Sequence, residues 1–328
     1  MTKQSKILLT LLDNLVWVLL FAFVLFNVFF TPAFFSSRNL LNVLFHTSIL
    51  ALLVLAQGIV MMVGELDLSG DAVLAFAPGI VILLTTSFNF GPVLGIIFTL
   101  GLGAALGWFN GFFVAKVKAN SFLFTLSTQI VLRGLILFFV PLSIAGLHNV
   151  YAFLGRGHIG NLQAATVMFL LIFFVFEMMF RKTTFGRKFK LTGGNRQAAF
   201  ISGIRTDRMI ILAFVIAGVL AAVAGLITAG RQNAVSNGMG LGMVTMAIAG
   251  AILGGCSFKG GTGKPLGLLG GALLLGLIDN ALTLQGVSVN LVSATKGSLI
   301  LVAILLDRWR YRLADVILHK ENMKKLET

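Results

Sequence analysis

Three carboxylates stand close together in the stretch MVGELDLSGDAVLAF, residues 62–76: Glu65, Asp67 and Asp71. Long apolar runs precede and follow this stretch. Because charge is costly in apolar surroundings, ionisable groups there usually pair with one another or line the path of a solute. The sequence shows no nucleophile–base set and no His/Asp/Glu cluster of the kind that enzymes need. These residues therefore indicate binding or gating rather than catalysis.

A purely structural role is the simpler interpretation for some of these residues. Asp67 or Ser69 can cap a helix that starts near residue 70, and Asp71 in its first turn would complement the helix dipole. This interpretation is favoured for Asp71 and remains open for Ser69.

Asp67 is the stronger functional candidate because it lies beside a predicted helix break. Non-helical backbone at membrane depth persists only where protein or a water-filled cavity satisfies its polar groups. We expect residues 64–71 to form a polar break near a translocation path, with Asp67 orienting it. A cation would pair with Asp67, and Arg133 or Lys296 is available. Glu65 is expected to face the cytoplasm without a role.

Polar side chains also interrupt other apolar runs. Asp279 and Asn280 lie within LLGLIDNALTLQG, where either hydrogen bonding between helices or contact with a passing solute would explain them. Gln57, Asn110 and Gln129 are weaker candidates of the same kind. A path for a polar solute should be lined by such hydroxyl and amide groups, because a conduit must also release its cargo.

Composition assigns the chain to the polytopic membrane proteins. Of its 328 residues, 58% are hydrophobic and 11% are charged, and the mean hydropathy is +0.99; soluble domains are about 25% charged. The first apolar run is too long for a cleaved signal peptide and is expected to be retained. The single Cys256 excludes an intrachain disulfide, and no Cys/His spacing suits a metal, so neither metal nor cofactor is expected.

A bilayer crossing needs about 20 apolar residues, and the runs predict an all-α domain of ten transmembrane helices occupying the whole chain, 1–328. Residues 1–13 and 307–328 are expected to be short cytoplasmic tails. The predicted helices are 14–31, 44–64, 70–88, 91–114, 121–141, 162–180, 209–229, 240–255, 266–286 and 289–306.

Lys and Arg predict the orientation, because they are retained on the cytoplasmic side. With both termini inside, most of the 25 basic residues fall on inner segments, and only Arg38, Arg156 and Arg231 fall on outer ones. The net charge of +14 is then explained by contact with anionic lipid, without nucleic acid. Glycine clusters such as GLGAALGWFNG, residues 101–111, predict close helix packing.

The inner loop 181–208 is predicted to be ordered. Gly193 and Gly194 break the chain, Asn195 is a good helix N-cap, and Gly203 suits the left-handed residue that ends a helix. The short helix between them carries the apolar residues Ala198, Ala199, Phe200 and Ile201. From the residues alone, this face can lie in the lipid headgroup region or dock into a groove on a soluble partner.

Three segments resemble the membrane permeases of ribose-type ABC sugar importers: GELDLSGDAVLA (64–75), TGGNRQAAFISGI (192–204) and LGGCSFKGGTGKPLGLLGGALLLGLIDNALTLQGVS (253–288). The ending KGSLILVAILLDRWR (296–310) is similar to the family's last span. The resemblance implies a permease of the prokaryotic inner membrane that imports a simple sugar, paired with an identical or homologous permease. It also implies a separate ATPase, which would dock on the loop around Asn195, and a soluble binding protein, which would contact residues 142–161 and 230–239.

The sequence departs from the family in one motif. Members usually have Gly-Ile-Asp-Leu-Ser followed by Val-Gly-Ser, whereas Glu65 and Leu66 precede Asp67 here and Gly-Asp-Ala follows Ser69. The cargo therefore stays open among pentoses, hexoses, methyl-sugars and signalling furanoses.

The main alternative function is a secondary transporter driven by an ion gradient, which often has ionisable residues and broken helices near the midplane. The ordered loop 192–204 argues against it. ATP hydrolysis by this chain is not expected, because KGGTGKP (259–265) has Pro265 where a phosphate-binding loop needs Ser or Thr.

Overall fold

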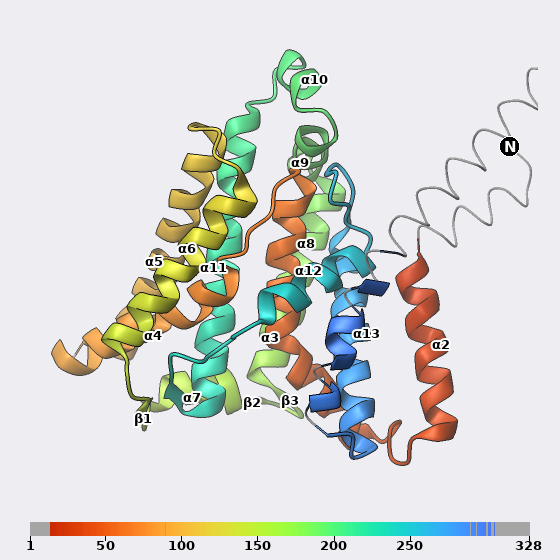
Figure 1. Cartoon of the computed structure of the whole chain (residues 1–328). Coiled ribbons are helices and arrows are strands. Elements are labelled where there is room, and N and C mark those ends of the chain that lie inside the picture. Colours follow the sequence, from red (N-terminus) through yellow and green to blue (C-terminus); the bar gives the residue numbers. More distant parts are fainter. Residues whose placement is uncertain are drawn as a thin grey trace, which may run out of the picture.

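A computed structural model describes residues 14–88, 90–288, 290–292, 294–299, 301, 302 and 305. This part of the chain is a bundle of helices with two pairs of two-residue strands (Figure 1). The helices are α2 (Leu15–Phe30), α3 (Ser37–Met62), α4 (Gly70–Phe88), α5 (Pro92–Ala115), α6 (Ser121–Phe139), α7 (Asn149–Arg156), α8 (Ala164–Lys182), α9 (Thr184–Gly194), α10 (Arg196–Ile201), α11 (Thr206–Gln232), α12 (Met243–Leu253) and α13 (Pro265–Leu284).

The expected all-α membrane architecture is confirmed. Seven of the described helices are long and apolar enough to cross a membrane, and α2 and α12 are shorter apolar helices. The tenth predicted helix, 289–306, falls partly outside the described residues, and both predicted tails fall wholly outside them.

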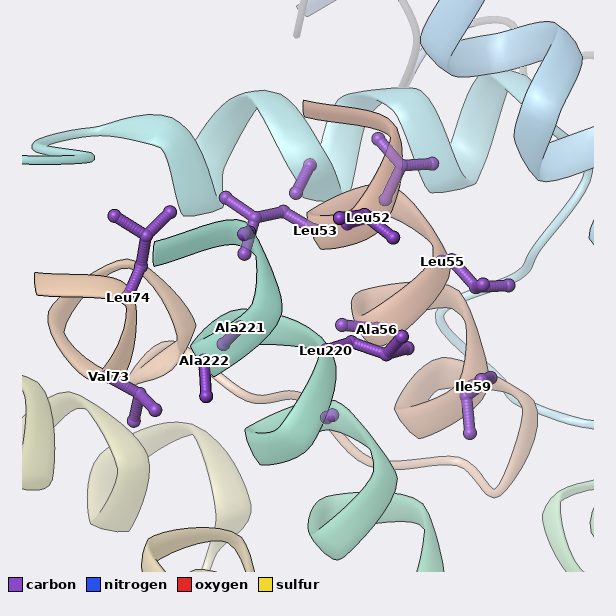
Figure 2. Close-up of a cluster of buried hydrophobic side chains, with 14 of the residues drawn as sticks. Leu52, Leu53, Leu55, Ala56, Ile59, Val73, Leu74, Leu220, Ala221 and Ala222 are labelled. Carbon is purple, nitrogen blue, oxygen red and sulfur yellow. The ribbon is translucent and has the colours of Figure 1, made fainter. Parts of the chain in front are cut away.

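Two central helices, α3 and α11, contribute more buried residues than any other helix. Figure 2 shows one cluster of buried side chains to which α3 contributes Leu52 and Leu55, α4 contributes Leu74 and α11 contributes Leu220. Helices α5 and α6 lie at the periphery and expose Phe and Leu side chains, as lipid-facing helices do. The core is therefore held by packing between helices rather than by exclusion of water.

The two ends of the bundle differ in charge. We call them the α10 end, where α9 and α10 lie, and the α7 end, where α7 and the strands lie (Figure 1). The strand pair β1 (Ile144–Ala145) with β4 (Ala234–Val235) and the pair β2 (His158–Ile159) with β3 (Leu162–Gln163) join loops at the α7 end. Among the described residues, Lys and Arg gather on the segments of the α10 end: Lys116, Lys118, Arg181, Lys182, Arg187, Lys188, Lys190, Arg196, Arg205, Arg208, Lys259 and Lys264.

Three predicted boundaries were wrong. Helix α3 begins at Ser37 rather than near residue 44, because the Ser36 side chain caps it by accepting a hydrogen bond from Asn39 N. Helix α9 was not predicted, and the expected break at Gly193 and Gly194 falls one residue later, at Asn195.

The third difference concerns α12, predicted as a full crossing over 240–255. Only Met243–Leu253 is helical, about 16 Å of helix at 1.5 Å per residue. The preceding residues are non-helical because Gly240 and Gly242 adopt left-handed φ angles of 68° and 76°. In Figure 1 this segment rises from the α7 end and reaches α12 near the middle of the bundle.

The glycine cluster of α5 does pack closely, as predicted. A Cβ on Gly107 would lie 2.2 Å from Phe214 O of α11, and one on Gly103 would lie 2.5 Å from Gly218 O. Backbones at such short separations leave no room for a side chain. The α5–α11 contact, the most extensive in the bundle, therefore depends on these glycines.

We predict that Gly107→Ala destabilises the protein by about 1–3 kcal/mol, because the added methyl forces the two backbones apart. Gly101→Ala is the matched control, since Gly101 lies on the same helix with open space around its Cβ position. Unfolding midpoints in detergent measure both. Equal midpoints for the two variants would contradict the packing described here.

Candidate functional site

The connection between α3 and α4 is a non-helical segment that enters the bundle. Helix α3 ends with Gly64 at a left-handed φ of 82°, and Gly64 N and Glu65 N donate to Met61 O and Val60 O. This pattern satisfies the last carbonyls of a helix and releases the chain into an extended conformation. Figure 1 shows the chain then running from the α10 end towards the middle of the bundle, where α4 begins.

Hydroxyl groups of α6 satisfy the backbone of this segment. Leu66 N donates to Ser121 Oγ at 3.2 Å, and Leu68 N donates to Thr125 Oγ1 at 2.9 Å. Ser121 and Thr125 are four residues apart and so lie on one face of α6. The segment therefore follows α6 inward, and its buried donors are paired as non-helical backbone in a membrane requires.

Asp67 and Ser69 form the next layer. Asp67 Oδ1 accepts from Ser69 N at 2.8 Å and from Ser69 Oγ at 2.6 Å. Asn110 of α5 donates to Ser69 Oγ at 2.9 Å and accepts from Thr128 Oγ1 of α6 at 2.9 Å, so α5, α6 and the non-helical segment are joined here.

Asp71, in the first turn of α4, is the centre of the polar network. Its side chain is fully buried. Oδ1 accepts from Gln129 Nε2 at 2.8 Å, and Oδ2 accepts from Gly242 N at 3.0 Å. The Arg133 guanidinium lies 3.5 Å from Oδ2 and donates to Asp71 O at 2.9 Å. A buried charge is tolerated only when it is paired and hydrogen-bonded in this way.

Arg133 links α4 to the non-helical segment before α12. Its Nη1 donates to Asn237 O at 3.0 Å and to Met239 O at 2.9 Å. Together with the Asp71 bond to Gly242 N, these contacts satisfy three backbone groups of residues 233–242. Two non-helical segments from opposite ends of the bundle thus meet at the Asp71–Arg133 pair.

The expectation that a cation pairs with Asp67 was wrong. Arg133 pairs with Asp71, and Lys296 pairs with Asp279 at 2.8 Å. Asp67 needs no cation because Ser69 supplies two donors to one of its oxygens.

Asp71 is the residue that sequence reasoning missed, since its place in the first turn of a helix suggested only an interaction with the helix dipole. The spacing of Gln129 and Arg133, one turn apart on α6, was the available signal for a buried acceptor.

A pocket of about 250 Å³ lies between α3, α12, α13 and the residues near Lys296. Pockets for drug-sized ligands are roughly 300–1,000 Å³, so this volume suits a small solute. The Met243 side of the pocket adjoins Gly242, the residue bound by Asp71. The lining residues are His46, Thr47, Leu50, Met243, Met246, Leu275, Gly276, Asp279, Asn280, Thr283 and Lys296.

Some polar side chains of this pocket have ionic or hydrogen-bond partners, and others have none among the described residues. Asp279 and Lys296 neutralise each other, and Asn280 exchanges two hydrogen bonds of 2.9 Å with Asn39 of α3. Thr47 Oγ1 is buried and has no hydrogen-bond partner among the described residues. Gln57 also lies in α3, buried, and its Nε2 has no described partner, but it does not line the pocket.

At the α10 end, Asn195 caps the short helix as predicted. Its Oδ1 accepts from Ala198 N at 2.9 Å, and Gly203 ends the helix at a φ of 81°. Of the apolar residues, Ala199 is buried, whereas Phe200 and Ile201 are 69% and 77% exposed. Figure 1 shows α10 standing beyond the ends of the spans.

The glycines before Asn195 act by close packing instead of breaking the helix. A Cβ on Gly193 would lie 2.1 Å from Met62 O, and Gly261 N donates to the same carbonyl at 3.1 Å. Gly194 follows as the last residue of α9. The end of α9 is therefore seated directly on the end of α3.

Glu65 makes an ion pair at this end. Its side chain is 13% exposed, and its Oε1 lies 2.5 Å from Nη2 of Arg196, the first residue of α10. The sequence could not assign this pair, because the partner is 131 residues away.

We predict that Asp71→Asn destabilises the protein by about 3–5 kcal/mol, because it leaves the buried Arg133 charge unpaired. Asp279→Asn is the matched control: the side chains of Asp279 and Lys296 are 46% and 38% exposed, and such pairs contribute about 0–1 kcal/mol. Denaturant titration of both variants in detergent measures the difference. A loss no larger for Asp71→Asn than for Asp279→Asn would show that the buried pair is not structural.

Comparison with known proteins gives consistent matches along most of the chain. Residues 39–306 match the family described as branched-chain amino acid transport system / permease component. The ribose import permease protein RbsC of Bacillus subtilis is 36% identical over 292 residues, which cover 88% of this chain and 90% of that protein. The L-arabinose transport system permease protein AraH of Escherichia coli is 32% identical, covering 76% of each chain. The fructose import permease protein FrcC of Rhizobium meliloti is 30% identical, covering 90% and 85%. No solved structure matches the chain significantly.

Proposed function

We propose, since the chain belongs to the family of branched-chain amino acid transport system permease components, that it forms the membrane path of an ATP-driven importer for a simple sugar. The chain is a transport subunit, and a separate ATPase would supply the energy. The observation that carries this proposal is the pair of non-helical segments meeting at Asp71 and Arg133 beside a small pocket that has polar side chains in its lining.

A sugar is favoured over an amino acid as cargo. The relatives reported above are named for ribose, L-arabinose and fructose. The charged groups of the pocket, Asp279 and Lys296, already neutralise each other, which leaves hydroxyl and amide groups facing the cavity. Such groups suit a neutral polyol better than a zwitterion, whose two charges would each need an unpaired partner.

The α10 helix is the proposed contact for the ATPase. Exposed Phe200 and Ile201 beyond the spans are typical of a helix that docks into a groove on a soluble partner. A cavity of about 630 Å³ lies beside Phe200 and is lined largely by basic residues, among them Lys118 and Arg208. Lipid headgroups remain the alternative contact, and the test below distinguishes the two.

The positive-inside rule supports an orientation in which the α10 end faces the cytoplasm of a prokaryotic cell. Both termini would then be cytoplasmic. A soluble binding protein would deliver sugar at the α7 end, where the β1–β4 pairing joins the two proposed contact segments, 142–161 and 230–239. A second permease subunit, identical or homologous, would complete the transporter.

An ion-gradient-driven carrier is the second candidate, because broken helices also occur at the centre of secondary transporters. The matches to import permeases and the exposed α10 helix favour the ATP-driven machine.

We predict that liposomes containing this chain take up radiolabelled ribose, arabinose or fructose only when the cognate ATPase, binding protein and ATP are supplied. Phe200→Asp should remove ATPase co-purification and uptake together, because it places a charge in the docking face. Phe35→Asp is the control, since Phe35, between α2 and α3, is 62% exposed and lies outside both α10 and the proposed contact segments of the binding protein. Uptake driven by an ion gradient without the ATPase would overturn the proposal.

We predict that Thr47→Val raises the KM for uptake of the transported sugar without lowering the stability of the protein. Valine has nearly the same shape, and the change removes a buried hydroxyl that has no partner among the described residues. Thr99→Val is the control: Thr99 is buried in α5 and donates to Gly95 O within its helix. An unchanged KM for Thr47→Val would remove this hydroxyl from the solute path.

A further inference from the structure

The segment 63–69 connects the α10 end with the centre of the bundle. One end of it begins beside α9 and α10, and the other leads into Asp71. Its backbone is bonded to α6 at two points, through Ser121 and Thr125. Because these bonds hold its backbone in place, a displacement of its first residues is passed along the segment to its other end.

Helix α10 is attached to the rest of the bundle at few points. The end of α9 before it is fixed by backbone contacts between Gly193 and the end of α3. Within α10, Ala199 is the one buried residue. Residues 202–205 join α10 to α11, which it also contacts. The one ion pair that α10 makes among the described residues joins Arg196 to Glu65.

The position of this pair is suited to transmitting movement. Arg196 is the first residue of α10, next to Asn195, which joins the two short helices. Glu65 follows directly after Gly64, where α3 ends. The carboxylate is largely buried, so solvent screens the pair less than it screens a surface ion pair.

We propose that the Glu65–Arg196 ion pair is the link through which movement of α10 reaches the Asp71–Arg133 centre and the segment 233–242. Glu65 is thus a positioning residue, which touches neither the solute nor the nucleotide. The inference rests on the proposed function, because it requires a partner that moves α10. A coupling of this kind needs the pair to hold in one state of the bundle more strongly than in the other.

The experiment measures movement at the far end of the proposed link. Spin labels are placed at Leu142 and Leu241, both highly exposed, in a Cys256→Ser background that removes the native thiol. The distance between the labels is recorded in the complete transporter in liposomes, without nucleotide and with ATP trapped by vanadate. This readout does not depend on knowing the cargo.

We predict that nucleotide shifts the label distance in the otherwise unsubstituted chain and that Glu65→Gln abolishes the shift while the ATPase remains bound. The charge exchange Glu65→Lys with Arg196→Glu should restore it, which a merely destabilising effect of Glu65→Gln would not allow. Sugar uptake per ATP should fall about tenfold in Glu65→Gln, within the roughly 5–150-fold range of allosteric couplings.

Glu177→Gln is the matched control. Glu177 of α8 accepts a hydrogen bond from Leu266 N at 3.1 Å, and it belongs neither to α10 nor to the lining of the cavity beside Phe200. Its loss should leave the shift intact. Three results would each overturn the proposed role of the Glu65–Arg196 pair. They are a full shift of the label distance in Glu65→Gln, failure of the charge exchange to restore the shift, and loss of ATPase binding in Glu65→Gln. A chain that binds no ATPase even without substitution would instead overturn the proposed function.

Discussion

The architecture depends on one buried ion pair, Asp71 with Arg133. Two stretches of backbone inside the bundle are not helical, and in a membrane their polar groups have no water to bond. Asp71 and Arg133 supply partners for Asn237 O, Met239 O and Gly242 N, and the hydroxyls of α6 do the same for the other stretch. Without this pair the segment 233–242 would be more stable as helix or in solvent than where it lies.

The same arrangement explains how distant parts of the bundle can act together. From the α10 end, Arg196 contacts Glu65, the segment 63–69 leads to Asp71, and Asp71 binds Gly242 beside the pocket. The first step is an ion pair and the last a hydrogen bond, both between groups that are buried or partly buried, and the chain itself connects them. Helices α5 and α11, by contrast, are packed closely against each other, because their glycines bring the two backbones into direct contact. We expect this helix pair to move as one unit.

Sequence reasoning predicted the elements well and the pairings poorly. Runs of apolar residues located most of the spans, and Asn195 and Gly203 located α10, because these signals are local. The partners of Glu65, Asp71 and Asp279 are brought near by folding, so spacing could not assign them. The length of helix α12 was overestimated because Val244, Ala247 and their neighbours form an apolar run. The backbone carbonyls before the helix, which Arg133 binds, cannot be recognised from the type of side chain.

Hydrogen–deuterium exchange of the backbone amides in 236–242 tests the central claim most directly. With Asp71 in place, these amides should exchange slowly for a non-helical segment, and Asp71→Asn should speed their exchange more than that of the amides of α5 and α11. Equal protection of 236–242 in both proteins would contradict the account, since the segment would then be held by something other than the Asp71–Arg133 pair.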